Sequence, residues 1–255
     1  MKIGIIDFNT VNAADVLASL NSLSSLIPEK AYYRIINFRN DHDFNQYDVL
    51  ILTGSVLSAF AFQEMLKKNK ITGEDYLHVN KVFTQLLEYE KPMLGICFGA
   101  QILALLKDGE IGHLEKSEMG FLKHKLTEQG GKDPVFGDLP DVFFGAHLHD
   151  DYVSKLPQSP EVKSSSIIAT RNNYIHAYKI VCENNAVCYG VQPHPEMSTP
   201  ANATFMIKFN EDKIRKEFGD EAYEKNAVLP ENATFDLPKV IPNFIIVHGS
   251  LFNHG

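Results

Sequence analysis

The sequence predicts an α/β protein with a mainly parallel β-sheet flanked by helices and an antiparallel extension of that sheet. Between residues 2 and 107, short apolar runs typical of buried strands alternate with longer segments rich in helix formers. From about residue 119 to 192 the pattern changes to shorter strands separated by Gly, Pro and Asn turns. The first pattern favours parallel pairing through helical crossovers, and the second favours antiparallel pairing through turns.

The first pattern predicts four strands and four helices. The strands are expected near residues 2–8, 31–38, 48–53 and 91–96, where the composition is apolar and β-branched. The helices are expected near residues 12–26, 56–68, 76–90 and 99–107. The second pattern predicts strands at 141–146, 166–170, 174–181 and 186–192, followed by a helix over 199–218. That helix would carry an apolar stripe formed by Phe205, Phe209, Ile214 and Phe218.

Cys97 occupies the turn between an expected strand and an expected helix, within the segment Gly95-Ile96-Cys97-Phe98-Gly99. Glycines two residues on either side allow a tight, strained turn that presents the side chain at its tip. The positive end of the helix dipole favours a reactive thiolate at such a position. The alternative is a buried cysteine in an ordinary strand–loop–helix unit.

His194 and Glu196 could complete a site around that thiol. Both belong to the segment Gly190-Val191-Gln192-Pro193-His194-Pro195-Glu196, which follows an expected strand. If the segment is extended, alternate residues share a face, so the imidazole and the carboxylate point the same way. A thiolate nucleophile needs a base, and the base needs an orienting acceptor. The alternative is an incidental His-Pro-Glu turn, but the cysteine turn upstream makes the pair more specific.

With these motifs the chain resembles the class I glutamine amidotransferases, including GMP-synthase-like glutaminase domains. The matching segments stand in the order found in that family, and together they cover about residues 1–210. They are Met1–Phe8, Asp48–Ser55, Gly95–Gln101, Glu118–Phe121, His149–Pro157 and Gly190–Glu196. The resemblance implies a flavodoxin-like three-layer fold and an enzyme that uses no cofactor. Residues 211–255 would form a C-terminal extension packed on, or appended to, the same domain.

The resemblance also implies roles for single residues. Cys97 would be the nucleophile, His194 its base and Glu196 the residue that orients the imidazole. The backbone N–H groups of Gly54, Ser55 and Phe98 would form the oxyanion hole. The substrate contacts would come from Gln101, Leu148, His149 and Asp150.

Four positions depart from the pattern of the family. Ser55 stands where a second glycine is usual, and Asp150 replaces the glycine of a His-Gly-Asp segment. A carboxylate at position 150 would repel the α-carboxylate of glutamine. Ala100 could widen the pocket, and Pro193 replaces an aromatic residue. These departures put the identity of the substrate in question more than the cleavage chemistry.

The composition points to a cytoplasmic protein. The 255 residues carry a formal net charge of −8 and no long basic run, which argues against nucleic acid as a partner. Three cysteines favour a reducing compartment over a disulfide scaffold, and Cys182 and Cys188 are expected to be core residues. No signal peptide or membrane-spanning run is recognisable. A specialised secretion signal would not be visible in the sequence.

Residues 147–151 (His-Leu-His-Asp-Asp) resemble a metal-binding motif, since alternate histidines and adjacent carboxylates can gather at the end of a strand. No second His/Asp cluster supplies further ligands at a clear spacing, so no metal site is expected. The other histidines are expected to be surface or structural residues: His42, His78, His113, His124, His176, His248 and His254. The apolar run Asn243–Val247 could add an edge strand, cap the core or mediate a subunit contact.

The sequence is therefore compatible with three functions. The first is a glutaminase that releases ammonia from glutamine through a γ-glutamyl thioester on Cys97, for a separate synthase. No Gly-x-x-x-x-Gly-Lys-Ser/Thr segment occurs, so the acceptor site would lie on another chain. The second is a stand-alone hydrolase of γ-glutamyl peptides or amides, and the third is an inactive binding or regulatory protein on the same scaffold.

Overall fold

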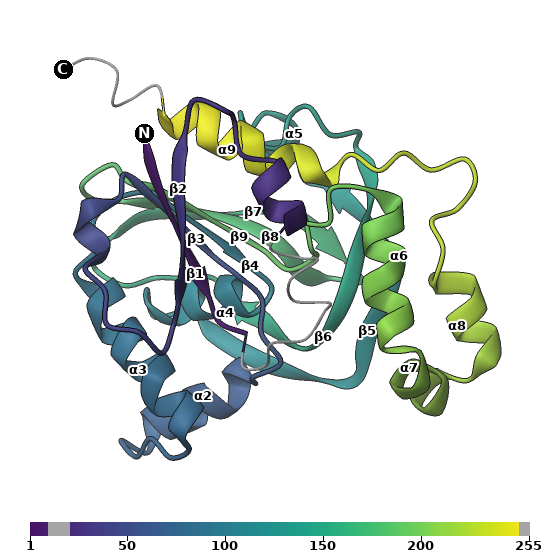
Figure 1. The fold of residues 1–255 in the computed structure, drawn as a ribbon, viewed down its shortest axis with the longest axis horizontal. Coiled ribbons are helices and arrows are strands. Elements are labelled where there is room, and N and C mark those ends of the chain that lie inside the picture. Colours follow the sequence, from purple (N-terminus) through teal and green to yellow (C-terminus); the bar gives the residue numbers. More distant parts are fainter. Residues whose placement is uncertain (10–20, 250–255) are drawn as a thin grey trace.

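The computed structural model describes residues 1–9 and 21–249, which build a nine-stranded sheet with the order β2-β1-β3-β4-β9-β8-β7-β5-β6 (Figure 1). One half is parallel: β1 (Lys2–Asp7), β2 (Tyr32–Asn37), β3 (Val49–Leu52), β4 (Met93–Ile96) and β9 (Val187–Val191). The other half is antiparallel: β5 (Glu110–Leu126), β6 (Val142–Lys155), β7 (Val162–Arg171) and β8 (Tyr174–Cys182). The expected α/β fold with an antiparallel extension is confirmed.

The parallel strands have a hydrophobic core on each face, because successive side chains point to opposite sides. Ile6, Leu50 and Leu52 belong to the core that also contains residues of α2 (Ala59–Lys67), α3 (Glu74–Leu87) and α4 (Phe98–Leu105). Ile3, Ile5 and Ile51 belong to the core on the other face, with α9 (Val240–Gly249). In Figure 1, α2 and α3 lie at the lower left and α9 at the top. The sheet is therefore the middle layer of three.

A third core covers the antiparallel half. Met119, Phe121 and Ala146 of β5 and β6 pack with residues of three consecutive helices. These are α6 (Pro200–Phe209), α7 (Glu211–Phe218) and α8 (Asp220–Asn226), at the right of Figure 1. Shorter elements are α5 (Glu128–Gly131) and the 3₁₀ turns η1 (Phe44–Gln46) and η2 (Leu237–Lys239). Helix α6 begins at Pro200, shortly after the His-Pro-Glu segment that follows β9, so it borders the expected site.

Two local expectations differ from the structure, and a third can be compared only in part. The helix expected over 199–218 is two helices, because Asn210 leaves the helical conformation (φ −104°, ψ 17°) between α6 and α7. Strand β5 has 17 residues and begins at Glu110, whereas the sequence pattern predicts only short strands, from about residue 119 onward. Polar residues interrupt its apolar pattern, and a register shift breaks its pairing between His113 and Glu118. The expected helix 12–26 lies partly outside the described residues. Within the part of it that the structure describes, residues 21–25 are helical.

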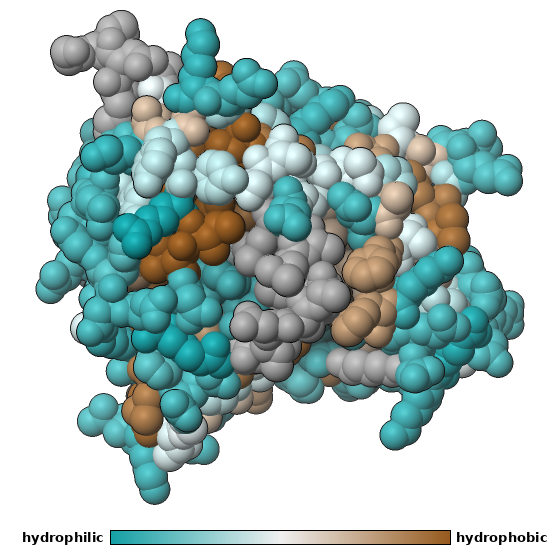
Figure 2. Space-filling view, viewed as in Figure 1, coloured by the Kyte–Doolittle hydropathy of each residue, from teal (hydrophilic) through white to brown (hydrophobic). Residues whose placement is uncertain are grey.

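The apolar run near the C-terminus forms part of α9 and packs into the core. Phe244 and Ile245 are buried with the strands of the parallel half. Figure 2 shows hydrophobic surface over β2 and beside α9 within a mostly hydrophilic face. The exposed apolar residues of these two elements include Tyr32, Tyr33, Ile35 and Ile246. Across residues 1–9 and 21–249, no helix combines the length and the apolar character that crossing a bilayer requires.

Candidate functional site

Cys97 lies in a strained turn between β4 and α4. Its backbone has φ 50° and ψ −111°, a conformation that residues other than glycine rarely adopt. The flanking glycines are required by close packing. A Cβ atom on Gly95 would lie 2.5 Å from the carbonyl oxygen of Gly99, and one on Gly99 would lie 2.2 Å from that of Leu52. The sequence therefore holds the cysteine at the tip of the turn through glycines at which any side chain would clash.

His194 and Glu196 lie beside Cys97, in the segment that follows β9. His194 Nδ1 is 2.7 Å from Glu196 Oε1, and both residues are buried. The backbone N–H of His194 donates to the carbonyl of Ala146 in β6 at 3.0 Å, which holds the segment against that strand. A Cβ atom on Gly54 would lie 3.2 Å from His194 Cε1 and 3.5 Å from Cys97 Cβ. The imidazole and the thiol therefore meet at the Gly54 turn.

The charges around His194 favour its protonated form. Burial alone would lower the pKa of His194, but the interactions with Glu196 and Cys97 outweigh burial and raise it well above 6.5. Glu196 uses one carboxylate oxygen for this contact, and its other oxygen is buried without a hydrogen-bond partner among the described residues. The arrangement can hold a thiolate–imidazolium pair.

Gln192 is a site residue to which the sequence assigned no role. Its side-chain N–H donates to Cys97 Sγ at 3.5 Å, and its Oε1 accepts a hydrogen bond from Gln101 at 3.1 Å. Gln101 also donates to the backbone carbonyl of Asp151 at 2.7 Å. The two glutamines thus join α4, β6 and the segment after β9 around the sulfur.

The thiol opens into a cavity of about 240 Å³. The expected site residues that line it are Gly54, Ser55, Cys97, Gln101, Leu148, His149, Asp150, His194 and Glu196. Phe98 does not line the cavity. Its ring is buried against Phe8, with ring centroids 5.4 Å apart, and only its backbone is placed at the turn. Ala100 is also buried in the core, so it does not widen the cavity.

Other residues of the cavity wall were missed. They are Asn9, Thr53, Val56, Leu57, Ser58, His113, Asp151, Met197, Met206 and Asn210. Most of them follow directly after β1 and β3 or belong to β6. Residues at the carboxyl ends of neighbouring parallel strands lie close together, so the positions after β1 and β3 could have been recognised from the sequence. Met206 and Asn210 come from α6 and the residue after it, outside every motif. Only the packing of α6 on the antiparallel half brings them to the site.

The cavity wall is acidic. Its carboxylates are Asp150, Asp151 and Glu196, and no Lys or Arg is among its described residues. Asp150 accepts a hydrogen bond from the Ser117 hydroxyl. Asp151 is buried and accepts hydrogen bonds from the Ser58 hydroxyl at 2.7 Å and the Phe60 N–H at 3.0 Å, at the start of α2. Through these hydrogen bonds Asp151 joins β6 to the start of α2.

Ser55, where the resembled family has a glycine, does not need the conformational freedom of that glycine. It does not adopt a positive φ. Its hydroxyl donates to the carbonyl of Phe8 at 2.8 Å and accepts from the Leu57 N–H at 3.2 Å. The turn after β3 is therefore held to the end of β1 by the serine side chain.

Within the part of the chain that the structure describes, one group of side chains could hold a metal ion: Glu118, His147, His149 and His176. The sequence indicated only the two histidines of β6, because the other two residues lie on β5 and β8. His124 and His176 are buried, as structural histidines would be, whereas His113 lines the cavity. Only His149 belongs both to this group and to the cavity wall.

Comparison with known proteins adds a family match. The family model described as Glutamine amidotransferase class-I matches residues 26–212. Gamma-glutamyl peptidase 3 of Arabidopsis thaliana is 26% identical over 197 residues, which cover 74% of this chain and 72% of that protein. Gamma-glutamyl peptidase 5 of the same plant is 27% identical over 177 residues, which cover 64% of this chain and 60% of that protein.

The chain is also similar to a synthase subunit in sequence and to a solved structure in fold. A protein of Ignicoccus hospitalis, named as one subunit of a glutamine-hydrolyzing GMP synthase, is 34% identical over 111 residues, which cover 44% of this chain and 54% of that protein. Among solved structures, a glutamine amidotransferase from Thermotoga maritima has a TM-score of 0.66 at 17% identity and covers 97% of both chains. At this identity the structural likeness supports the fold alone.

Proposed function

The chain belongs to the class I glutamine amidotransferase family, and from that premise we propose that it hydrolyses the side-chain amide of glutamine or of a related γ-glutamyl compound at Cys97. The observation that carries the proposal is the position of Cys97. It lies on a strained turn beside the His194–Glu196 pair and opens into the cavity. These are the parts that nucleophilic acyl transfer requires: a nucleophile, a base and a residue that orients the base.

The proposed reaction has two steps. The Cys97 thiolate attacks the amide carbon, and His194 gives its proton to the leaving nitrogen, so that ammonia or an amine departs and a γ-glutamyl thioester remains. Water, deprotonated by His194, then attacks the thioester and releases the acid and the thiolate. Backbone N–H groups of Gly54, Ser55 and Phe98 are proposed to stabilise the oxyanion, each lowering the barrier by about 3 kcal/mol.

The proposed substrate contacts are Gln101, Leu148, His149 and Asp150, which all line the cavity. The Gln101 amide nitrogen already bonds Asp151 and Gln192, so this residue would act through its remaining oxygen or by holding Gln192. Leu148 supplies an apolar surface for the methylene groups of a γ-glutamyl chain. Asp150 brings a negative charge that would select among the charged ends of substrates.

As the first candidate we propose a glutaminase that provides ammonia to a synthase on a separate chain. The relative from Ignicoccus hospitalis supports it, because that protein is named as a subunit of a glutamine-hydrolyzing GMP synthase. The sequence contains no phosphate-binding Gly-x-x-x-x-Gly-Lys-Ser/Thr segment that could activate an acceptor. The acceptor itself would be bound by the partner.

The second candidate is a stand-alone γ-glutamyl hydrolase. Asp150 in the cavity wall does not decide between the two candidates, because the γ-glutamyl group of a peptide keeps the same free α-carboxylate as glutamine. Two relatives are named gamma-glutamyl peptidases, and the match to one of them covers 72% of its length. We propose a cytoplasmic location for either enzyme, because its three cysteines are free.

The experiment that tests the proposal compares ammonia released from free glutamine with amine released from γ-glutamyl dipeptides. Cys97→Ala is the control and should abolish both activities. Faster turnover of glutamine, with a synthase retained by immobilised Cys97→Ala, supports the first candidate, and faster turnover of the dipeptides supports the second. Release that persists in the Cys97→Ala variant, or no release from either substrate, would exclude both.

A further inference from the structure

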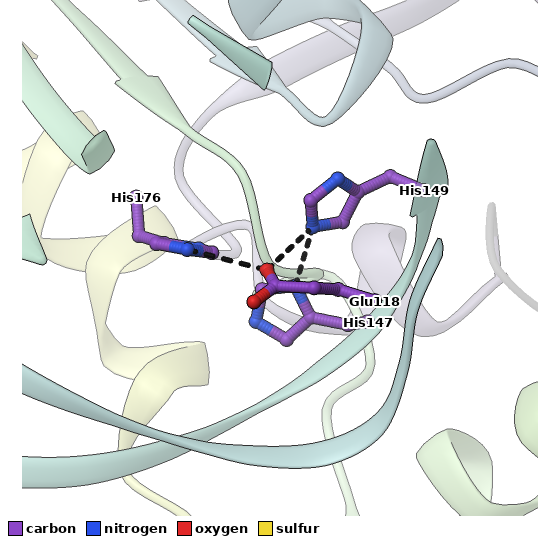
Figure 3. Close-up of side chains that lie close together, drawn as sticks. All are labelled: Glu118, His147, His149 and His176. Atoms are coloured by element: carbon purple, nitrogen blue, oxygen red, sulfur yellow. Dashed lines mark hydrogen bonds and ion pairs between the residues drawn. The ribbon is translucent and has the colours of Figure 1, made fainter. Parts of the chain in front are cut away.

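Four side chains from three strands converge beside the cavity (Figure 3). Glu118 of β5 pairs directly with His149 of β6 in the strand register, and His147 shares the same face of β6. His176 reaches the group from β8. One nitrogen or oxygen atom of each side chain lies within 4.8 Å of those of the other three.

The closest contacts within the group join atoms that carry lone pairs. His149 Nε2 is 3.2 Å from Glu118 Oε2 and 3.0 Å from His147 Nδ1. His176 Nε2 is 3.3 Å from the same Glu118 oxygen. Figure 3 shows the three rings arranged around the carboxylate. The carboxylate is an acceptor only, so Glu118 Oε2 needs either an N–H donor or a cation among the surrounding rings.

Outer hydrogen bonds orient the lone pairs of His149 and His147 toward the centre of the group. His149 Nδ1 lies 2.9 Å from the backbone carbonyl of Asp151, which can only accept, so Nδ1 carries the hydrogen and Nε2 of the neutral ring is bare. Arg171 holds the other oxygen of Glu118 at 3.1 Å. His147 Nε2 lies 2.8 Å from His124 Nε2. Such outer partners are typical of histidines that bind metals.

We propose that Glu118, His147, His149 and His176 form a site for a divalent transition-metal ion of the zinc type. Metal–ligand distances of about 2.0–2.1 Å place tetrahedral ligands about 3.3–3.4 Å apart, close to the contacts of 3.0–3.3 Å. Imidazole nitrogens with one carboxylate are ligands that zinc accepts. Four ligands from the protein leave no open position, so the site is structural.

The ion would link β8 to β6 across the curled antiparallel half of the sheet. Strands β8 and β6 are separated in the sheet by β7 and β5, yet the four ligands join them directly. The same two strands hold the segment that carries the proposed base. The carbonyl of His176 accepts from the Gln192 N–H at 2.8 Å, and that of Ala146 accepts from the His194 N–H at 3.0 Å. The site therefore lies where it can stabilise the position of His194.

The experiment measures metal binding by the full chain. Protein stripped with a chelator is titrated with Zn²⁺, and Co²⁺ serves as a spectroscopic probe. We expect one equivalent of Zn²⁺ per chain, visible absorption of tetrahedral Co²⁺ and a higher Tm with Zn²⁺. His176→Gln should weaken Zn²⁺ binding more than 100-fold, because loss of a supporting hydrogen bond alone costs about 10–100-fold. His78→Gln, outside the site, should bind as the wild type does.

If His176→Gln fails to fold, Glu118→Gln provides the same comparison, and the wild-type titration stands without either variant. A wild-type chain that takes up well under one equivalent of Zn²⁺ would overturn the proposal. A folded His176→Gln or Glu118→Gln variant that binds Zn²⁺ with wild-type affinity would also overturn it. The contacts among the four side chains would then be hydrogen bonds and not metal coordination. Metal content and Tm are read without a substrate, so the result does not depend on the proposed amide hydrolysis.

Discussion

The side-chain amide of Gln192, two residues before His194 in the sequence, donates a hydrogen bond to the sulfur of Cys97 at 3.5 Å. A cysteine at the tip of a turn has few neighbours that can fix its side chain. Gln192 provides one, and Gln101 in turn fixes Gln192. The segment after β9 would therefore supply both the proposed base and a donor that positions the thiolate.

Replacing Gln192 by Leu should lower kcat by about 10- to 100-fold. The change keeps the volume of the side chain and removes a hydrogen bond to a charged group, which is worth about 1.5–3 kcal/mol. Steady-state kinetics of amide hydrolysis measures the effect. Gln85→Leu, on the exposed face of α3, is the matched control and should retain wild-type kcat. Equal kcat in both variants would show that the donor is dispensable.

Glu196→Gln should reduce turnover by between about tenfold and 10⁴-fold while the protein stays folded. The carboxylate is the main influence that opposes the effect of burial on His194, so its loss lowers the pKa of the imidazole. The pH–rate profile should shift accordingly, and thermal unfolding should be little changed. Wild-type turnover in this variant would mean that another residue orients His194.

The motifs at Cys97 and His194 could be recognised from the sequence because their geometry is local. Glycines two residues from the cysteine signal the tight turn, and the spacing of His194 and Glu196 signals a shared face. Met206, and the approach of Glu118 and His176 to the two histidines of β6, could not be recognised in this way. They depend on how α6 packs and on how far the antiparallel half curls, which no spacing in the sequence encodes.

Asp150→Gly should lower the KM for free glutamine more than the KM for a glutamine derivative whose α-carboxylate is capped as an amide. The carboxylate belongs to the cavity wall, so its removal relieves a like-charge repulsion that only the free acid experiences. The capped substrate serves as the internal control. Parallel changes in the two KM values would show that Asp150 does not select between them.

Acid should destabilise the protein partly through His248 in α9. Burial, followed by the charge of Lys179, lowers the pKa of His248 from 6.5 to about 4, with partial opposition from Asp133. The unfolded chain thus binds this proton at higher pH than the folded one. The stabilisation is complete above pH 6.5 and is lost as the pH falls through about 4, by up to about 3 kcal/mol.

His248→Phe removes this titration and keeps an aromatic ring beside Phe244, whose centroid lies 4.8 Å from that of His248. The free energy of unfolding, measured with urea between pH 7 and 4, should fall less steeply in the variant than in the wild type. We propose that residues 211–249 are an integral part of the domain, and this comparison tests α9. The same slope in both proteins would show that His248 is not buried in the folded state.

The central claim is that Cys97 alone becomes acylated during turnover. Cys182 could compete for an electrophile, because a hydrogen bond from Cys188 lowers the pKa of its thiol to about 7. Access distinguishes Cys97, because of the three cysteines only Cys97 lines the cavity. The most direct measurement is mass spectrometry of the protein after reaction with a glutamine analogue that carries an electrophilic carbon in place of the amide. We expect a single adduct on Cys97 and none in Cys97→Ser, whereas equal labelling of the three cysteines, or an adduct that persists in Cys97→Ser, would contradict the claim.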